Sequence, residues 1–340
     1  MSSDYGYINA RVRGMKSKLL DPGFYSSALD GSDFRAFMAS LSQSPYMREL
    51  EEAQGREQGR EAGLSAVDRA VARNVYHTAR SLLTFSDGVP RELIGLLLLR
   101  HDLANAKTIA RGKHAQRAAE DIVGSLFPAG EFKPSLLEQA AAAPDMVAAA
   151  QLLALTRNPI GSAFLRAARR YQSDNDLFAV ELALDQAYYK AVAKGLKEAG
   201  APAQLQRHFQ REIDATNLRT ALKLRGGGVK ADLFVPGGRD VQRATFDAIM
   251  ADADSGALQA LSNGPFAAVA QAAGLPEAET IIRSVLDVSA KRLSADPLDI
   301  GVVVDFLRRK EEEAARIRLL ARGKFYGVPR AQLEKELAHA

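Results

Sequence analysis

The residues of this chain that could do chemistry are its histidines and its clustered carboxylates, because the 340 residues include no cysteine. Without thiols, the chain can hold no disulfide, zinc–thiolate site, iron–sulfur cluster or cysteine nucleophile. Its five histidines are scattered and form no HxH or HxxxH pair, so the spacing of metal ligands is missing. Carboxylates gather at 49–52 and 311–313, which we interpret as solvated helix faces without a histidine base nearby. We therefore predict no metal site and no catalytic residues.

Motifs for nucleotide binding and nucleophilic catalysis are also missing. The sequence has no GxxxxGK[ST] phosphate loop, no GxSxG nucleophile elbow and no dinucleotide fingerprint. We accordingly predict no cofactor and no small-molecule substrate. An enzyme whose site is assembled from distant residues stays an alternative, which an ordered polar cluster lining a closed pocket would support.

The charge balance gives weak support for an anionic partner. The chain carries 45 basic and 41 acidic residues, a net charge of +4. A nucleic-acid interface would need a concentrated basic stripe interleaved with aromatic side chains, and we find none, so no nucleic-acid partner is predicted. The longest uncharged helical stretch, Met146–Thr156, is far shorter than the roughly 20 residues that span a bilayer. We expect no membrane-spanning segment and, since the N-terminus lacks an apolar region, no signal peptide.

Helical periodicity dominates the sequence and predicts an all-α fold. Apolar residues recur at three- and four-residue spacing in 68–81, 176–196 and 278–293. Asp176 is expected to cap the second of these helices, and Val288 is expected on the apolar face of the third. Helix breakers gather at three places, of which the first two are interpreted as connections between repeats. These places are 127–134, 226–238 and 274–276.

A first repeated motif consists of a leucine, a hydroxyl residue, two spacers, a proline and an apolar residue. It occurs at Leu41–Tyr46, Leu155–Ile160 and Leu261–Phe266. The residue before a proline is pushed out of the α region, so each copy should follow a helix end. The apolar residue after each proline should pack into the core.

A second motif pairs an acid with a polar residue three positions later, and a basic residue follows. The copies are Asp102–Asn105 with Arg111, Asp214–Asn217 with Lys223 and Arg225, and Glu313–Arg316 with Arg322. Residues three positions apart lie on one helix face. The basic residue should lie in the last helical turn, where it opposes the helix dipole, and Gly112, Gly226 and Gly323 should be C-caps.

These motifs keep their order in the chain, and the proline-to-acid separations are 57, 55 and 48 residues. Between the two motifs, Asp68, Glu181 and Glu279 each precede an amphipathic stretch. We therefore predict three diverged helical units, packed about a pseudo-threefold axis or, alternatively, stacked as a solenoid. The predicted boundaries are 1–20 for an N-terminal helix and 21–128, 129–245 and 246–340 for the repeats.

The chain resembles the C subunits of the V/A-type ATP synthases, which are relatives of the d subunit of the eukaryotic vacuolar ATPases. The stretches that carry the resemblance are Tyr5–Arg13, Leu96–Asn105, Glu212–Leu224, Asp296–Gly301 and Arg318–Lys324. They run through nearly the whole chain in one order. One departure is Arg316, which stands where the family pattern, like the other two copies, has an asparagine.

The resemblance implies three similar helical domains that form a funnel around a central cavity, on the cytoplasmic face of a membrane rotor ring. The cavity would be a socket for the central shaft, which is made of the D and F subunits. The protein would transmit torque in ATP synthesis coupled to proton transport, without catalysis or bound nucleotide. It would be a monomer when isolated and present once per complex, with D, F and the proteolipid ring as partners.

A socket wall that docks a shaft should be polar, so repeated helix positions are the candidate partner contacts. They are Arg100, Asn105, Arg111, Asn217, Arg219, Arg225, Arg316 and Arg322. Capping and pairing within helices would also explain several of them. A helical-repeat scaffold that binds peptide or nucleic acid is the alternative function, and salt-sensitive binding of nucleic acid would favour it.

Overall fold

The computed structural model describes residues 5–53, 62–228, 232–251 and 255–339, and all regular elements within these ranges are helical. The first part of the chain forms α1 (Gly6–Lys16), α2 (Pro22–Asp30), α3 (Phe34–Leu41), α4 (Met47–Ala53), α5 (Ala62–Thr84) and α6 (Gly88–His114). The middle forms α7 (Ala119–Gly124), α8 (Pro134–Ala142), α9 (Met146–Ala154), α10 (Pro159–Asp174), α11 (Leu177–Glu198) and α12 (Ala203–Leu224). The last part forms α13 (Arg243–Ala251), η1 (Ser255–Leu261), η2 (Ala267–Gln271), α14 (Leu275–Leu293), α15 (Gly301–Phe325) and α16 (Arg330–His339). The predicted all-α class is confirmed.

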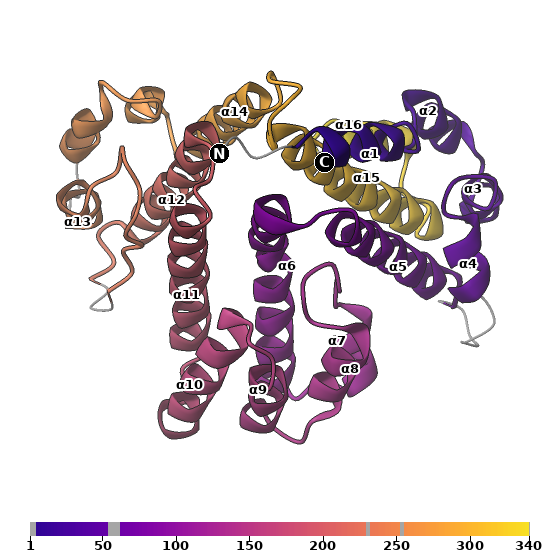
Figure 1. The fold of residues 1–340 in the computed structure, drawn as a ribbon, viewed down its shortest axis with the longest axis horizontal. Helices are drawn as coiled ribbons and strands as arrows, with labels where there is room; N and C mark the ends of the chain where they lie inside the picture. Colours follow the sequence, from indigo (N-terminus) through magenta and orange to yellow (C-terminus); the bar gives the residue numbers. More distant parts are fainter. Residues whose placement is uncertain (1–4, 54–61, 229–231, 252–254, 340) are drawn as a thin grey trace.

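Three pairs of long helices organise the described part of the molecule (Figure 1). Helix α6 packs against α11, α12 packs against α14, and α15 packs against α5. Shorter helices contact each pair: α7 to α10 around α6, α13 beside α12, and α1, α3 and α16 around α15. Because α15 also contacts elements from the beginning of the chain, the C-terminal and N-terminal segments share one packing unit. The division into domains at the predicted boundaries stays a prediction.

Aspartate side chains begin several helices. Asp33, Asp145 and Asp176 each accept a hydrogen bond from the backbone N–H three residues later. This satisfies one of the N–H groups that a helix start leaves without an intrahelical partner. The predicted cap at Asp176 is confirmed.

The three helices predicted from periodicity are present as α5, α11 and α14, and each is longer than the periodic stretch. Their apolar faces are buried, with Val71, Val180 and Ile282 almost fully enclosed. The prediction for Val288 was wrong, because this side chain is 45 % exposed. Its neighbour Ser289 is buried instead and binds a histidine of α12, so the inward face of α14 is partly polar there.

The glycines of the second motif have two different roles. Gly226 follows the end of α12 and adopts a φ of 69°, as a C-terminal glycine should. The prediction was wrong for Gly112 and Gly323, which lie inside α6 and α15. A Cβ at either position would collide with Ile122 or Leu333, so these glycines let the following short helix pack closely. Arg111, Lys223 and Arg322 do lie in the last turns, as predicted, whereas Arg225 follows the end of α12.

The core is mainly aliphatic, and the apolar residue that follows the proline in each copy of the first motif is part of it. Tyr46, Ile160 and Phe266 are fully buried, and each copy of the motif follows a helix end, as predicted. One large apolar cluster extends over most of the chain, and a smaller one joins α12, α13 and α14. Among the described residues, no helix combines the length and the hydropathy that a bilayer crossing requires.

Candidate functional site

Three residues, each next to one of the three copies of the second motif, lie at a polar junction between long helices. The residues are Arg100 of α6, Glu212 of α12 and Glu311 of α15, and each lies two positions before the acid of the second motif. The Arg100 guanidinium lies 3.9 Å from the Glu311 carboxylate and interacts electrostatically with Glu212. Burial would lower the pKa of Arg100, but the two carboxylates raise it above its ordinary value. We call Arg100, Glu212 and Glu311 the central junction.

Two histidines extend the central junction. His101 Nε2 lies 3.2 Å from Glu311, and His208 Nε2 lies 3.4 Å from Glu212. Burial would raise the pKa of both glutamates, but the paired histidines and Arg100 hold these pKa values below the ordinary range. The prediction that the 311–313 carboxylates lie on a solvated face without a histidine was therefore wrong. These carboxylates are partly buried between packed helices, and each of them has a cationic or histidine partner.

The acid and the asparagine of the second motif hold a loop against their own helix. Asp102 accepts hydrogen bonds from the backbone N–H groups of Glu131 and Phe132, at 2.8 and 3.0 Å. Asn105 exchanges two hydrogen bonds with the backbone of Phe127. We call this arrangement a loop clasp, and Gly130 permits it because a Cβ there would collide with the Asp102 carboxylate.

The second repeat builds the same loop clasp. Asp214 accepts from three consecutive backbone N–H groups, at 239 to 241. Asn217 exchanges two hydrogen bonds of 2.8 Å with the backbone of Val235. Both breaker-rich segments that were predicted as connections between repeats therefore contain clasped loops, although residues 229–231 lie outside the described part of the chain.

At the third copy of the second motif, the described residues form no such loop, which explains the departure of this copy from the motif. Glu313 instead accepts hydrogen bonds from the Tyr46 hydroxyl at 2.7 Å and from the backbone N–H of Leu20 at 2.5 Å. Lys310 Nζ lies 2.6 Å from the same carboxylate, so the buried charge is paired. Arg316 lies over the ring of Tyr25 in α2. The N-terminal segment thus occupies the place of the loop, and an asparagine is not required.

The two motifs meet between different repeats. The Asn158 amide of the second proline motif donates to Asp102 at 2.8 Å. Tyr46 of the first proline motif donates to Glu313 of the last repeat, 267 positions away. Each of these acids is therefore bound by the proline motif of another repeat, which the spacing in the sequence did not indicate.

Asp68, Glu181 and Glu279, the acids that lie between the two motifs in the sequence, each take part in an ion pair. Arg111 is bidentate to Glu181, at 2.6 and 2.7 Å. Arg322 lies 2.8 Å from Asp68. A third pair joins α12 to α14, where Arg219 and Lys223 lie 2.7 and 3.0 Å from Glu279. Each ion pair joins two long helices that pack against each other. It lies near the C-terminal end of α6, α12 or α15.

The eight candidate contact residues occupy different environments. Asn105 and Asn217 are buried, and their amides bind the clasped loops. Arg100 belongs to the central junction, and Arg219 and Arg316 are half-buried. The side chains of Arg111 and Arg322 are 59 % and 49 % exposed despite their ion pairs. Arg225 is the half-buried residue that follows α12. Contact with a shaft stays a prediction for all eight.

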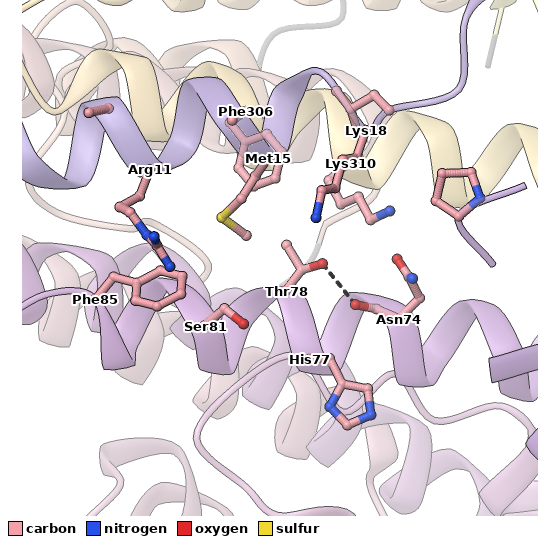
Figure 2. Close-up of a pocket in the computed structure, with 14 residues that line it drawn as sticks. Arg11, Met15, Lys18, Asn74, His77, Thr78, Ser81, Phe85, Phe306 and Lys310 are labelled. Atoms are coloured by element: carbon pink, nitrogen blue, oxygen red, sulfur yellow. Dashed lines mark hydrogen bonds between the residues drawn. The ribbon is translucent and has the colours of Figure 1, made fainter. Parts of the chain in front are cut away.

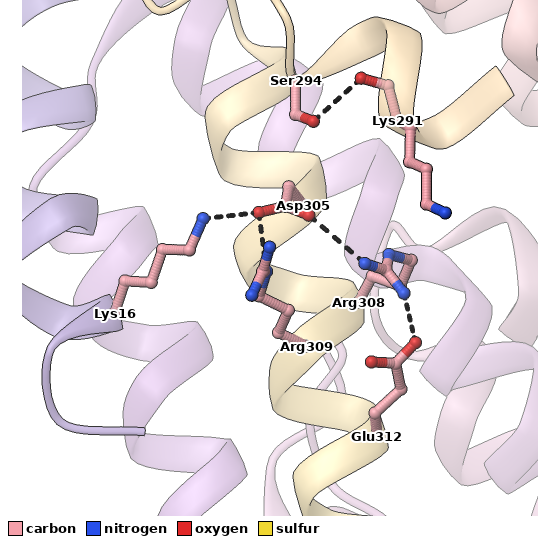
Figure 3. Close-up of polar contacts among 7 residues, drawn as sticks. All are labelled: Lys16, Lys291, Ser294, Asp305, Arg308, Arg309 and Glu312. Atoms are coloured by element: carbon pink, nitrogen blue, oxygen red, sulfur yellow. Dashed lines mark hydrogen bonds and ion pairs between the residues drawn. The ribbon is translucent and has the colours of Figure 1, made fainter. Parts of the chain in front are cut away.

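A cluster around Asp305 was missed by the sequence analysis. Figure 3 shows Lys16 of α1 and two arginines of α15 around this carboxylate. Lys16 Nζ lies 2.7 Å from Asp305, and Arg309 and Arg308 lie 2.9 and 3.3 Å away. Burial would raise the pKa of Asp305, but Lys16 and Arg309 hold it below its ordinary value. The i,i+3 and i,i+4 spacing within α15 was visible in the sequence, whereas the contact with Lys16 depends on the packing of α1.

The described residues contain no group of three or more His, Asp or Glu side chains placed to hold a metal ion. The polar clusters join helices and loops. The loop clasps, the repeated ion pairs and the central junction each connect segments that are far apart in the sequence. The fold and these contacts define an all-helical protein of repeated helix pairs.

The comparisons with known proteins assign this helical repeat protein to a family. The chain belongs to the ATP synthase (C/AC39) subunit family, whose model matches residues 8–336. It is 36 % identical over 341 residues to the C subunit of the V-type ATP synthase of Deinococcus radiodurans, which covers 99 % of this chain and 92 % of that protein. It is 38 % identical over 338 residues to the C subunit of the V-type ATP synthase of Thermus thermophilus, with 99 % of both chains covered.

The similarity extends to archaeal proteins. The C subunit of the A-type ATP synthase of Methanosarcina acetivorans is 28 % identical over 338 residues, which cover 95 % of this chain and 89 % of that protein. The resemblance read from the sequence is thereby confirmed.

Proposed function

We propose that this chain is a non-catalytic central-stalk subunit of a V/A-type ATP synthase, on the cytoplasmic face of the membrane. It links a D–F shaft to the membrane rotor ring and transmits torque between them. The observation that carries the proposal is the central junction, where equivalent positions of three repeats lie together. This supports packing about a common pseudo-threefold axis, and such packing would present similar walls to a shaft.

A torque-transmitting body has to resist deformation, and the polar contacts support this requirement. The loop clasps hold the connections of two repeats against their helices. The ion pairs tie the long helices within each packing pair. Close-packed interiors with satisfied polar groups are stiff, since movement would break many contacts at once.

Among the candidate residues, the two exposed arginines of the repeated ion pair are the most accessible to a partner. Arg111 and Arg322 occupy equivalent positions in two repeats, and both keep about half of their side-chain surface exposed. The two buried asparagines have their amides bound inside the chain. We therefore propose Arg111 and Arg322 as shaft contacts and a structural role for Asn105 and Asn217.

The test is the affinity of the purified chain for a purified D–F shaft. We expect a double variant, Arg111→Glu and Arg322→Glu, to bind about tenfold more weakly, because each charge reversal replaces an attraction with a repulsion. The matched control is Arg48→Glu, an exposed arginine that also has a carboxylate partner, at 3.1 Å, but lies outside the repeated motif. Circular dichroism establishes that the variants fold. Equal affinity of the folded double variant and the control would refute the assignment of these contacts.

A further inference from the structure

A cavity of about 590 Å³ lies between α1, α5 and α15. Figure 2 shows Arg11 reaching from α1 towards Phe85, which follows the end of α5, and the side chains of Lys18 and Lys310 ending in the gap between the helices. The volume lies within the range of about 300–1,000 Å³ that is typical of small-molecule sites. The ion pairs and loop clasps described above do not explain why this cavity is present.

The lining of the cavity is basic. It contains Arg11, Lys18, His77 and Lys310, and no acidic residue. The charge of Lys310 is matched by Glu313 behind it, at 2.6 Å. No described carboxylate lies within ion-pair distance of Arg11 or Lys18, so these two cations give the cavity a positive surplus.

The surroundings of Arg11 leave its positive charge able to bind an anion. Its guanidinium lies 3.9 Å from the centre of the Phe85 ring, which orients the group without neutralising it. The hydroxyl of Ser81 and the amide of Asn74 also line the cavity and offer donors for an anion.

One wall of the cavity is apolar. This surface is provided by Met15 of α1, Leu19 after the end of α1, Phe85 after the end of α5, and Phe306 of α15. A bare hydrated anion would leave it in contact with water. A ligand that combines one anionic group with an apolar chain would pair both charge and apolar surface.

We propose that this cavity binds an anionic amphiphile, in which a phosphate group carries an alkyl chain. Arg11 and Lys18 bind the phosphate oxygens, and the chain lies against Met15 and Phe306. The two cations match the charge of a phosphate monoester, which is close to −2 at neutral pH. The proposal is independent of the rotor function, because it rests on this cavity alone.

Isothermal titration calorimetry with hexyl phosphate, which stays monomeric in solution, tests the proposal on the full chain. We expect one site, with affinity at least about tenfold higher than for inorganic phosphate, because only hexyl phosphate covers the apolar wall. We also expect affinity at least about tenfold higher than for hexyl glucoside, which has the same chain but no charge. Affinity should fall as salt concentration rises. Binding of inorganic phosphate or hexyl glucoside as tightly as hexyl phosphate would overturn the proposal.

Two variants locate the site. Lys18→Glu should lower the affinity for hexyl phosphate about tenfold or more, because it reverses the charge of one of the two cations. The control is Lys190→Glu, the same change at an exposed lysine of α11, which should leave this affinity unchanged. Ser81→Phe fills the cavity without changing its charge and should abolish binding. Unfolding temperature verifies that each variant is folded. Folded Lys18→Glu and Ser81→Phe proteins that bind hexyl phosphate like the original chain would refute the site.

Discussion

At the scale of single residues, the repeated acids show how burial and hydrogen bonding oppose each other. Asp102 is fully buried, and burial raises its pKa to about 6, although hydrogen bonds from Phe132, Glu131 and Asn158 lower it. The pKa of Asp214 is raised for the same reason, against three backbone hydrogen bonds. The clasps therefore hold loops at an electrostatic cost, which grows as the carboxyl groups ionise.

The pKa of Asp102 predicts a pH-dependent stability. Because the native pKa of about 6 exceeds the ordinary 3.8, the folded chain binds the proton more tightly. The resulting stabilisation is present below pH 3.8 and is lost as the pH rises through 6. Asp102→Asn removes this titration, so the free energy of unfolding of the original chain should fall relative to the variant by about 2 kcal/mol between pH 4 and pH 7.

Urea denaturation at several pH values measures this difference. The hydrogen bonds that Asp102→Asn loses add a constant offset, so the pH slope is the diagnostic quantity. Asp287→Asn, the same change at an exposed position of α14, is the control and should have little effect on the slope. Parallel curves for the original chain and Asp102→Asn would contradict the prediction.

At the scale of helices, glycines determine how closely consecutive elements approach. Gly161 lies near the start of α10, and a Cβ there would collide with the backbone carbonyl of Leu153 in α9. Gly301 begins α15 and has the same relation to the backbone of Leu293 in α14. Backbone cannot rotate away as a side chain can, so both positions require glycine for steric reasons.

Alanine substitutions separate this steric requirement from helix propensity. Gly161→Ala should lower the free energy of unfolding by about 2 kcal/mol, because the added methyl forces α9 and α10 apart. Gly14→Ala should raise it by about 0.5–1 kcal/mol, since Gly14 is inside α1 and a Cβ there meets nothing within 4 Å. Thermal and urea unfolding of both variants measures the two changes. Effects of the same sign at both positions would argue against the described packing of α9 and α10.

At the scale of the whole molecule, contacts between distant segments join the two ends of the described chain. Asn9 of α1 donates to the backbone carbonyls of Pro297 and Asp299, which precede α15. Lys16 pairs with Asp305 farther along α15. A residue later in the N-terminal segment contacts a residue later in the C-terminal segment, so α1 and α15 run parallel. The packing unit around α15 therefore depends on residues from both ends.

The charges of the central junction predict how the stability of the folded chain depends on pH. Arg100→Ala leaves Glu212 and Glu311 without the cation between them, and their charges repel each other. At pH 7 we expect a loss of about 2 kcal/mol, below the value for a fully buried pair because these side chains are partly exposed. Both carboxyl groups have native pKa values below the ordinary 4.5, so the stabilisation from Arg100 is present above that pH. It should disappear as the pH falls through the native pKa values.

Unfolding free energies at pH 7 and pH 3.5 test this prediction. Arg48→Ala, which removes an exposed i,i+4 pair, should cost no more than about 0.5 kcal/mol at either pH. A cost for Arg100→Ala that does not change with pH would show that lost packing, and not charge, explains the effect.

The sequence by itself determined the helical class, the ends of the helices at the proline motif, the cap at Asp176 and the positions of the repeated acids and bases. These features depend on neighbours within about four residues, and helix geometry relates such neighbours directly. Even here the prediction for Gly112 and Gly323 was wrong, because their role depends on a helix that follows and folds back onto them.

Only the tertiary structure decided which residues of different repeats meet. Glu313 binds Tyr46 across 267 positions, and Arg322 binds Asp68 across 254. Arg100 of α6 and Glu311 of α15 lie 3.9 Å apart, although no periodicity within either helix encodes this contact. A local pattern specifies the face on which a side chain lies, whereas the partner of that face depends on the path of the chain between the two helices.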